Sequence, residues 1–175
     1  METPSQATYL ERFHAYMPSF DIDPERINLF DVGDRYLFKH YFERTEIFDA
    51  ISEYYNGDDY RFEVPTDELK DVRDALDEQY YKLVVIDDPE PYCVVKEQYT
   101  PHADILRNSV AHWSRDDHSF FLMKDELSVR EAREAGASPI SETSFVVGLW
   151  TASTLAVAAH VGMTHGADRR RRVPS

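Results

Sequence analysis

The order of strand-like and helix-like patterns in residues 60–135 constrains the fold more than any other feature of this sequence. Apolar and polar side chains alternate over residues 60–64, which predicts a strand. Pro65 and Thr66 then end the strand and start a helix, because proline interrupts strand pairing and threonine is a good helix cap. The predicted helix has one apolar side, formed by Leu69, Val72 and Leu76.

Two apolar runs with strand composition follow this helix, at Tyr81–Ile86 and Tyr92–Glu97. The residues between them are two prolines and three acidic residues, a composition typical of a turn. Parallel neighbours in a sheet need a crossover of about a dozen residues. The short connection therefore predicts that the two runs form an antiparallel hairpin.

A second helix is predicted over Pro101–Arg115. Leu106, Val110 and Trp113 recur there at the i, i+4 and i+7 spacing of one helix face. The apolar run His118–Met123 then predicts a fourth strand. The chain thus has a strand, a helix, two strands, a helix and a strand in that order.

That order is the split βαβ pattern of ferredoxin-like folds. A short helix is also expected after the fourth strand, because Ser128 and Glu131 match a capping box and Gly136 suits a helix end. We therefore predict an α+β fold, with a ferredoxin-like antiparallel sheet that carries two helices on one face. A parallel α/β unit is the alternative interpretation.

Three parts of the chain are expected. Residues 60–136 form the ferredoxin-like core, residues 1–59 an N-terminal α/β extension packed on it, and residues 137–175 a hinge, an apolar helix and a basic tail. The flexible joint is placed at Gly136–Glu142. Within the extension we predict a helix over Thr8–Met17, a strand over Ile27–Phe30 and a helix over Glu43–Tyr55.

The segment Phe145–Met163 carries no Asp, Glu, Lys or Arg, in a chain of which 30% is charged. As a helix it would be about 28 Å long, close to the roughly 30 Å hydrocarbon core of a bilayer. Hydroxyl groups near its middle, such as Thr151 and Ser153, disfavour insertion. The segment is therefore either a membrane anchor or a helix that packs on protein. Small residues that favour close helix contact form a row at Gly148, Ala152 and Ala156, which His160 continues.

A basic tail follows the apolar segment, with four consecutive arginines at Arg169, Arg170, Arg171 and Arg172. If the segment spans a membrane, this run stays on the cytoplasmic side and places the acidic domain outside. The first residues, METPSQATYLERF, have neither the basic nor the apolar part of a signal peptide. We therefore expect the protein in the cytoplasm or at the cytoplasmic membrane.

Acidic residues dominate the rest of the chain. The sequence has 33 Asp and Glu against 19 Lys and Arg, a net charge of −14, and without the four arginines of the tail the charge is −18. Only five of the cationic residues are lysines. Strong negative charge keeps a protein soluble when salt screens its self-repulsion, so this composition predicts a salt-adapted, halophilic organism. An acidic protein from an ordinary proteome is the alternative.

One outer face of the helix predicted over residues 101–115 carries four polar side chains: Asp104, Asn108, His112 and Arg115. They suit the binding of an anion or the positioning of a proton donor, so they are our candidate for a dispersed enzymatic site. A solvated helix face has the same pattern and is the simpler interpretation. No catalytic residue is assigned.

Metal and cofactor motifs are missing from the sequence. His112, Asp116, Asp117 and His118 lie close together, but the chain has no H-E-x-x-H, no cysteine pair and no EF-hand loop. It also has no glycine-rich nucleotide motif. Cys93, the only cysteine, lies in an apolar run and is expected to be a buried strand residue. We therefore predict neither a metal nor a cofactor.

Aromatic side chains on a sheet of this topology stack on bases in RNA-binding modules. Tyr60, Phe62, Tyr92 and Phe120 are candidates, but the negative charge disfavours phosphate contact, so nucleic acid is not the expected partner. We predict a non-enzymatic interaction or regulatory module. Residues 145–163 would contact a protein partner or a second copy, or attach to a membrane. An enzyme with a dispersed site and a nucleic-acid-binding regulator are the alternatives.

Overall fold

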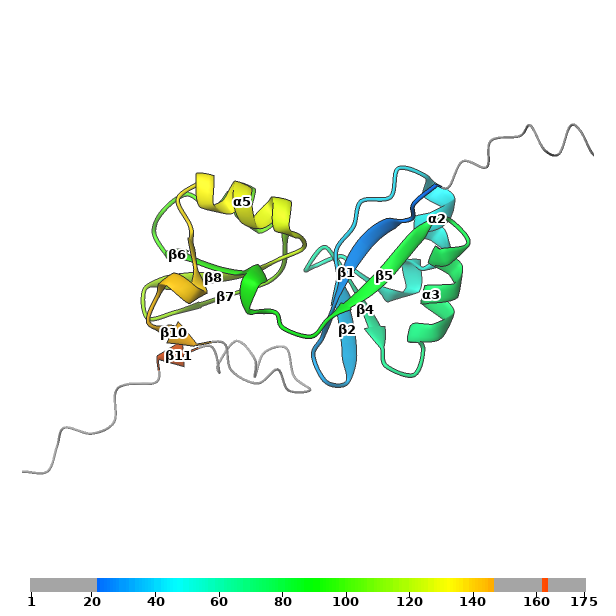
Figure 1. Ribbon diagram of the computed structural model, residues 1–175, viewed down its shortest axis with the longest axis horizontal. Helices are drawn as coiled ribbons and strands as arrows, with labels where there is room; N and C mark the ends of the chain where they lie inside the picture. Colours follow the sequence, from blue (N-terminus) through cyan, green and yellow to red (C-terminus); the bar gives the residue numbers. More distant parts are fainter. Residues whose placement is uncertain (1–21, 147–161, 164–175) are drawn as a thin grey trace, which may run out of the picture.

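The computed structural model describes residues 22–146 and 162–163 (Figure 1). These residues form a mixed α+β fold with two larger sheets, a two-stranded ladder and four α-helices. The predicted α+β class is therefore confirmed. The number and connection of the sheets differ from the prediction.

The N-terminal sheet consists of β1 (Glu25–Asp31), β2 (Arg35–Phe38), β3 (Tyr55–Asn56), β4 (Arg61–Pro65) and β5 (Tyr81–Ile86). Its strand order is β3-β4-β2-β1-β5. β1 and β5 run parallel, from the pair Glu25 and Tyr81 to the pair Phe30 and Ile86, and the other neighbours are antiparallel. The strands predicted over residues 60–64 and 81–86 are confirmed as β4 and β5.

Two helices, α2 (Thr45–Ala50) and α3 (Leu69–Asp77), cover one face of the N-terminal sheet (Figure 1). The predicted apolar side of α3 is confirmed, because its three residues are buried against the sheet. Removing such side chains from water is the main stabilising contribution to this layer. The buried residues of this core are Ile27, Leu29, Phe38, Phe42, Ile47, Ile51, Phe62, Val64, Leu69, Val72, Leu76 and Leu83.

The C-terminal sheet consists of β6 (Cys93–Glu97), β7 (Ser109–Arg115), β8 (His118–Met123) and β9 (Ser138–Pro139). Its strand order is β7-β8-β6-β9, and all of its neighbours are antiparallel. Two helices, α4 (Ala103–Arg107) and α5 (Glu126–Glu134), pack on one face. The core beneath them contains Val94, Ile105, Phe121, Met123, Ala132 and Ala137.

A third core joins the two sheets. Phe30, Val32 and Leu37 supply its N-terminal side, and because side chains alternate along a strand, the same strands feed the helix-covered core with Leu29 and Phe38. Both faces of the N-terminal sheet are thereby buried. The C-terminal sheet and its following turn supply Cys93, Val95, Val110, Ala111, Trp113, Phe120, Leu122 and Ile140.

The predicted hairpin of β5 and β6 is not formed. β5 pairs with β1, whereas β6 pairs with β8 and β9, so the turn over residues 87–91 leads from one sheet to the other. The strands predicted to form one ferredoxin-like sheet are thus divided between two. The physical reason is that residues 25–38, predicted as part of an extension, form two central strands and offer β5 a parallel partner.

The helix predicted over Pro101–Arg115 is confirmed only in its first half. α4 ends at Arg107, and β7 follows from Ser109. Asp116 and Asp117 then turn the chain into β8 with φ angles of 49° and 62°, the positive values that a tight two-residue hairpin turn requires. The tight turn favours a strand before it over the last two turns of a helix.

A β-bulge explains why β7 has helix-like spacing. The register against β8 shifts between Ser109 and Ala111, so two residues of β7 oppose one of β8. Val110, Ala111 and Trp113 therefore enter the same core, although strict alternation would separate Val110 from Ala111. Leu106, which was predicted to share a helix face with Val110 and Trp113, is instead 37% exposed.

The helix ends show one confirmed cap and two that differ. Asp125, not Ser128, caps α5, because its Oδ1 accepts a hydrogen bond from the Ser128 amide at 2.7 Å. In α3 the N-cap position is likewise Glu68 and not Thr66. Gly136 ends α5 as predicted, with a φ of +92° that favours glycine.

The remaining sequence predictions have mixed outcomes. The strand over Ile27–Phe30 is confirmed within β1, and the helix over Glu43–Tyr55 is confirmed in part as α2 and a 3₁₀ turn. The segment Gly136–Glu142 was predicted as a flexible joint. It contains β9, which pairs with β6, and the buried Ile140. The helix over Thr8–Met17 lies outside the described residues.

The apolar segment differs from a helix at both ends. Its first two residues form β10 (Phe145–Val146) and its last two form β11 (Gly162–Met163), and the two strands pair antiparallel. A helix of this length would hold its ends about 27 Å apart, so the predicted helix neither begins at Phe145 nor ends at Met163. Within the described residues, no helix is long and apolar enough to cross a bilayer.

Candidate functional site

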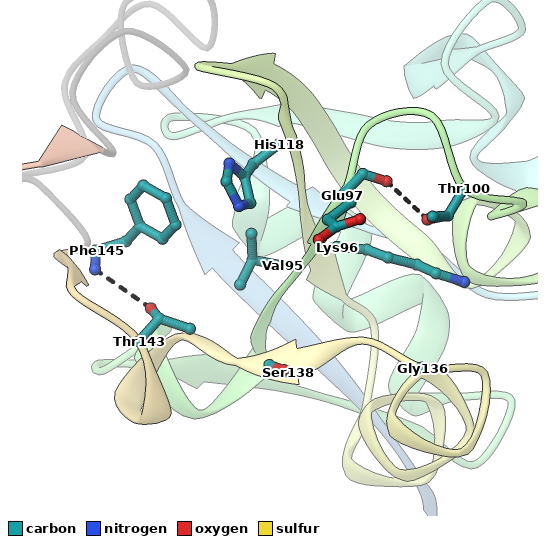
Figure 2. Close-up of a pocket in the computed structure, with 9 residues that line it drawn as sticks. All are labelled: Val95, Lys96, Glu97, Thr100, His118, Gly136, Ser138, Thr143 and Phe145. Carbon is teal, nitrogen blue, oxygen red and sulfur yellow. Dashed lines mark hydrogen bonds between the residues drawn. The ribbon is translucent and has the colours of Figure 1, made fainter.

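The candidate site is a hollow of about 320 Å³ at the edge of the C-terminal sheet. Figure 2 shows Val95 at its centre, with His118 and Phe145 to one side and Glu97 to the other. The hollow therefore combines an apolar floor with a carboxylate and an imidazole. Its lining residues are Val95, Lys96, Glu97, Thr100, His118, Gly136, Ser138, Thr143 and Phe145.

The pairing of β6 with its two neighbours creates this hollow. Glu97 and His118 are directly opposite each other on β6 and β8, so both side chains project from the same face. On the other side of β6, β9 pairs only with Val94 and Val95. The hollow lies beside the start of β9, where the pairing of β9 with β6 does not extend to Lys96 and Glu97.

His118 belongs to an aromatic wall. The centroid of its ring lies 5.1 Å from that of Phe145, whose ring is also 4.9 Å from Phe120 in a T-shaped arrangement. His118 Nδ1 is 2.7 Å from the carbonyl oxygen of Asp116. Because a carbonyl only accepts hydrogen bonds, Nδ1 carries a proton, and Nε2 is the ring nitrogen left for a ligand.

Lys96 ties the rim of the hollow together. Its Nζ donates to the carbonyl oxygens of Pro101 at 2.6 Å and Ala135 at 2.7 Å. The second contact holds the end of α5, where Gly136 turns the chain toward β9. A Cβ at Gly136 would lie 3.8 Å from Lys96 Nζ, so the two residues are close neighbours. This ammonium group therefore serves main-chain carbonyls and not a carboxylate.

Two hydroxyl groups in the hollow already have partners (Figure 2). Thr100 Oγ1 donates to the Glu97 carbonyl at 2.7 Å, and Thr143 Oγ1 accepts from the Phe145 amide at 3.2 Å. Glu97, by contrast, is exposed and has no ion-pair partner within residues 22–146. The groups left for a ligand are therefore the Glu97 carboxylate, His118 Nε2 and the Ser138 hydroxyl. They suit a cationic or hydrogen-bond-donating group with an apolar stem.

The four residues of the predicted polar face do not share one helix face. Asp104 lies on α4, Asn108 ends that helix, and His112 and Arg115 lie on β7. Their neighbours also differ. Asp104 pairs with Arg107 at 3.3 Å, and Asn108 Nδ2 donates to Glu131 at 3.3 Å.

His112 stands apart from that group. Its ring stacks over Phe121 at 6.2 Å, and burial together with nearby His102 lowers the pKa of His112. Arg115 pairs with Asp116 at 3.3 Å. The arrangement that motivated a dispersed enzymatic site is thus not present as one surface.

Other predicted candidates also have clear positions. Cys93 is fully buried on β6, as expected, and burial raises the pKa of its thiol. Phe62 and Phe120 are core residues, so they do not offer a stacking surface. In the described part of the chain, no group of His, Cys, Asp and Glu is arranged to hold a metal. The small-residue row at Gly148, Ala152, Ala156 and His160 and the arginines of the basic tail lie outside the described residues.

A second polar region, missed by the sequence analysis, is the junction, which we define as Lys39 and Arg61 with the carbonyls of Ser109 and Val110. Lys39 Nζ donates to the Ser109 oxygen at 2.9 Å, and Arg61 Nη1 to the Val110 oxygen at 3.1 Å. The β-bulge of β7 disturbs the ladder at these carbonyls, and the two cations supply donors. The sequence signal for this junction is Arg61, a cation within the strand predicted over residues 60–64.

Arg61 is the more enclosed of the two junction cations. Its side chain is 8% exposed and lies 2.7 Å from Glu63 and 3.1 Å from Asp59. Burial alone would raise the pKa of Glu63, but the hydrogen bond and charge of Arg61 outweigh it and the pKa lies below its ordinary value. The junction is therefore a network that holds the two sheets together.

No family model, curated protein or solved structure matches this chain.

Proposed function

We propose that the protein is a non-enzymatic interaction module that associates with a second copy of itself through residues 145–163. The observation that carries this proposal is the ladder of β10 and β11. Phe145 is opposite Met163, and Val146 is opposite Gly162. The two ends of the segment therefore lie side by side, next to the hollow that Phe145 lines.

The composition of this segment supports contact with another surface. It contains no Asp, Glu, Lys or Arg, while 30% of the whole chain is charged. Extended apolar stretches of this kind mark interaction sites in soluble proteins. A second copy offers the same small residues, Gly148, Ala152 and Ala156, so a two-fold contact would let both chains approach closely at once.

Attachment to a membrane through the same segment is the competing proposal. A bilayer would accept the apolar side chains, but the hydroxyl groups of Thr151, Ser153 and Thr154 would have to find partners within it. A protein surface offers hydrogen-bonding groups more readily. We therefore favour self-association.

Sedimentation velocity over a range of protein concentrations tests the proposal. The buffer should contain high salt, because two copies with a net charge of −14 repel each other at low ionic strength. We expect the wild-type chain to form a dimer and Ala156→Glu to be a monomer. Ala158→Glu is the matched control, since residue 158 lies about 200° around a helix from residue 156.

Three results would count against self-association. A wild-type chain that stays monomeric at every concentration would exclude it. Equal dissociation by Ala156→Glu and Ala158→Glu would remove the role of the small-residue row. Sedimentation with lipid vesicles, without dimerisation in their absence, would favour membrane attachment instead.

A further inference from the structure

We propose that the hollow is the docking site of the basic tail of the same chain, residues Arg169–Arg172. This inference does not rest on self-association. It concerns a different segment and a surface that is complete within the described residues. The tail itself lies outside them, so the argument starts from the hollow and from the point at which the chain leaves β11.

The connection to the tail begins in the wall of the hollow. Phe145 lines the hollow, and its partner in the ladder is Met163. Only five residues separate Met163 from Arg169. An extended chain spans at most about 3.3–3.6 Å per residue, so the first arginine can lie as far as roughly 20 Å from Met163 and still reach back across the hollow.

The charge distribution of the chain favours a return of the basic tail to the hollow. The rest of the chain has a net charge of −18, and the four arginines are its only run of consecutive cations. Within the hollow, Glu97 is exposed and has no ion-pair partner in the described part of the chain. Lys96 competes little for Glu97, because its Nζ already donates to two carbonyls.

The shape and chemistry of the hollow suit an arginine side chain in particular. Its planar guanidinium can donate two parallel hydrogen bonds to the Glu97 carboxylate. Its methylene stem can lie on Val95, and the aromatic wall of Phe145 and His118 offers a ring close to the cation. Because Nδ1 of His118 already contacts the Asp116 carbonyl, Nε2 is the ring nitrogen that remains on this wall for a ligand.

Limited proteolysis of the full chain at low ionic strength tests the docking. Trypsin cleaves after arginine, so the rate of cleavage within residues 169–172, followed by mass spectrometry, reports how often the tail is free. We expect Glu97→Gln to raise this rate by about fivefold, the upper range for an exposed carboxylate–guanidinium pair. High salt should raise the wild-type rate to the same level.

Glu46→Gln is the matched control. Glu46 is an exposed carboxylate on α2, so the substitution changes the net charge by the same amount away from the hollow. It should leave the cleavage rate unchanged. If both substitutions accelerate cleavage equally, the tail responds only to overall charge and the docking site is wrong. Equal rates for the wild type and Glu97→Gln would also overturn the proposal.

A second measurement reads the hollow directly. Replacing all four arginines of the tail by glutamine should shift the NMR signals of the His118 ring at low salt and leave those of His40 unchanged. An unchanged His118 spectrum would overturn the proposal. Protection that grows with protein concentration would show that the tail binds a second copy and not its own chain.

Discussion

The junction and the hollow use scarce cations in the same way but at different depths. Lys39 and Arg61 at the junction, and Lys96 at the hollow, all donate to main-chain carbonyls. The Arg61 side chain is almost fully buried, whereas the hydrogen bonds of Lys96 lie at the surface. Because buried interactions contribute more to folding than exposed ones, the junction should determine stability, while the hollow remains available for binding.

The largest effect is expected at Arg61. Arg61→Met should lower the free energy of unfolding by about 3 kcal/mol, because it leaves the Val110 carbonyl without its Arg61 donor and removes one of the two guanidinium partners of Glu63, which keeps only Arg35. Urea unfolding at neutral pH measures the change. Lys70→Met removes an exposed ion pair on α3 and should leave the free energy of unfolding nearly unchanged. Similar losses for both variants would show that burial of Arg61 does not increase its contribution to stability.

A smaller loss is expected at the second junction cation. Lys39→Met removes one partly buried, charge-assisted hydrogen bond to Ser109, which should cost about 2 kcal/mol in the same urea experiment. Burial and the nearby Lys124 and Arg61 lower the pKa of Lys39, so part of the loss is offset by relief of its desolvation. A stabilised variant would show that desolvation outweighs the hydrogen bond.

The hollow should be less sensitive. Lys96→Met removes two hydrogen bonds that lie at the surface, and water can replace both, so we expect a loss of about 1 kcal/mol. Lys96→Met should lower the free energy of unfolding less than Lys39→Met does, although it removes two hydrogen bonds instead of one. A Lys96→Met protein less stable than Lys39→Met would show that the depth of these hydrogen bonds does not set their contribution to stability.

The smallest effect is a pH dependence at His40, beside the N-terminal sheet. Burial disfavours the charged imidazole and lowers the pKa of His40, although Glu25 at 3.8 Å opposes this. As the pH falls below about 6.5, the unfolded chain binds the proton first, so stability present above that pH is lost toward the lower folded-state pKa. His40→Phe should flatten the wild-type decline in thermal unfolding temperature between pH 7 and 5. A parallel decline in both proteins would assign it to other groups.

Local signals in the sequence predicted single elements well and their partners poorly. The apolar side of α3 and the strands β5 and β8 follow from the spacing of a few residues. The parallel pairing of β1 with β5 joins Glu25 to Tyr81, and no local pattern carries that information. The predicted hairpin therefore assigned β5 to the wrong neighbour.

The error at β7 and the omission of the site have related causes. A β-bulge gave Val110 and Trp113 a spacing that fits a helix, so the polar residues beside them were placed on one helix face. The hollow depends on the register of Glu97 against His118 and on the late start of β9, which pairs with Val95 but not with Lys96 or Glu97. Neither is visible until the strands are paired.

The parallel pair at one edge of the N-terminal sheet, β1 and β5, also has a consequence for synthesis of the chain. β1 leaves the ribosome long before β5, and it cannot complete its ladder until Ile86 is available. Even then, Phe30, Val32 and Leu37 remain uncovered until the C-terminal sheet has been made. Contacts so distant in sequence slow folding and prolong the exposure of apolar surface. The nascent chain should therefore depend on chaperones more in its first half than after residue 140.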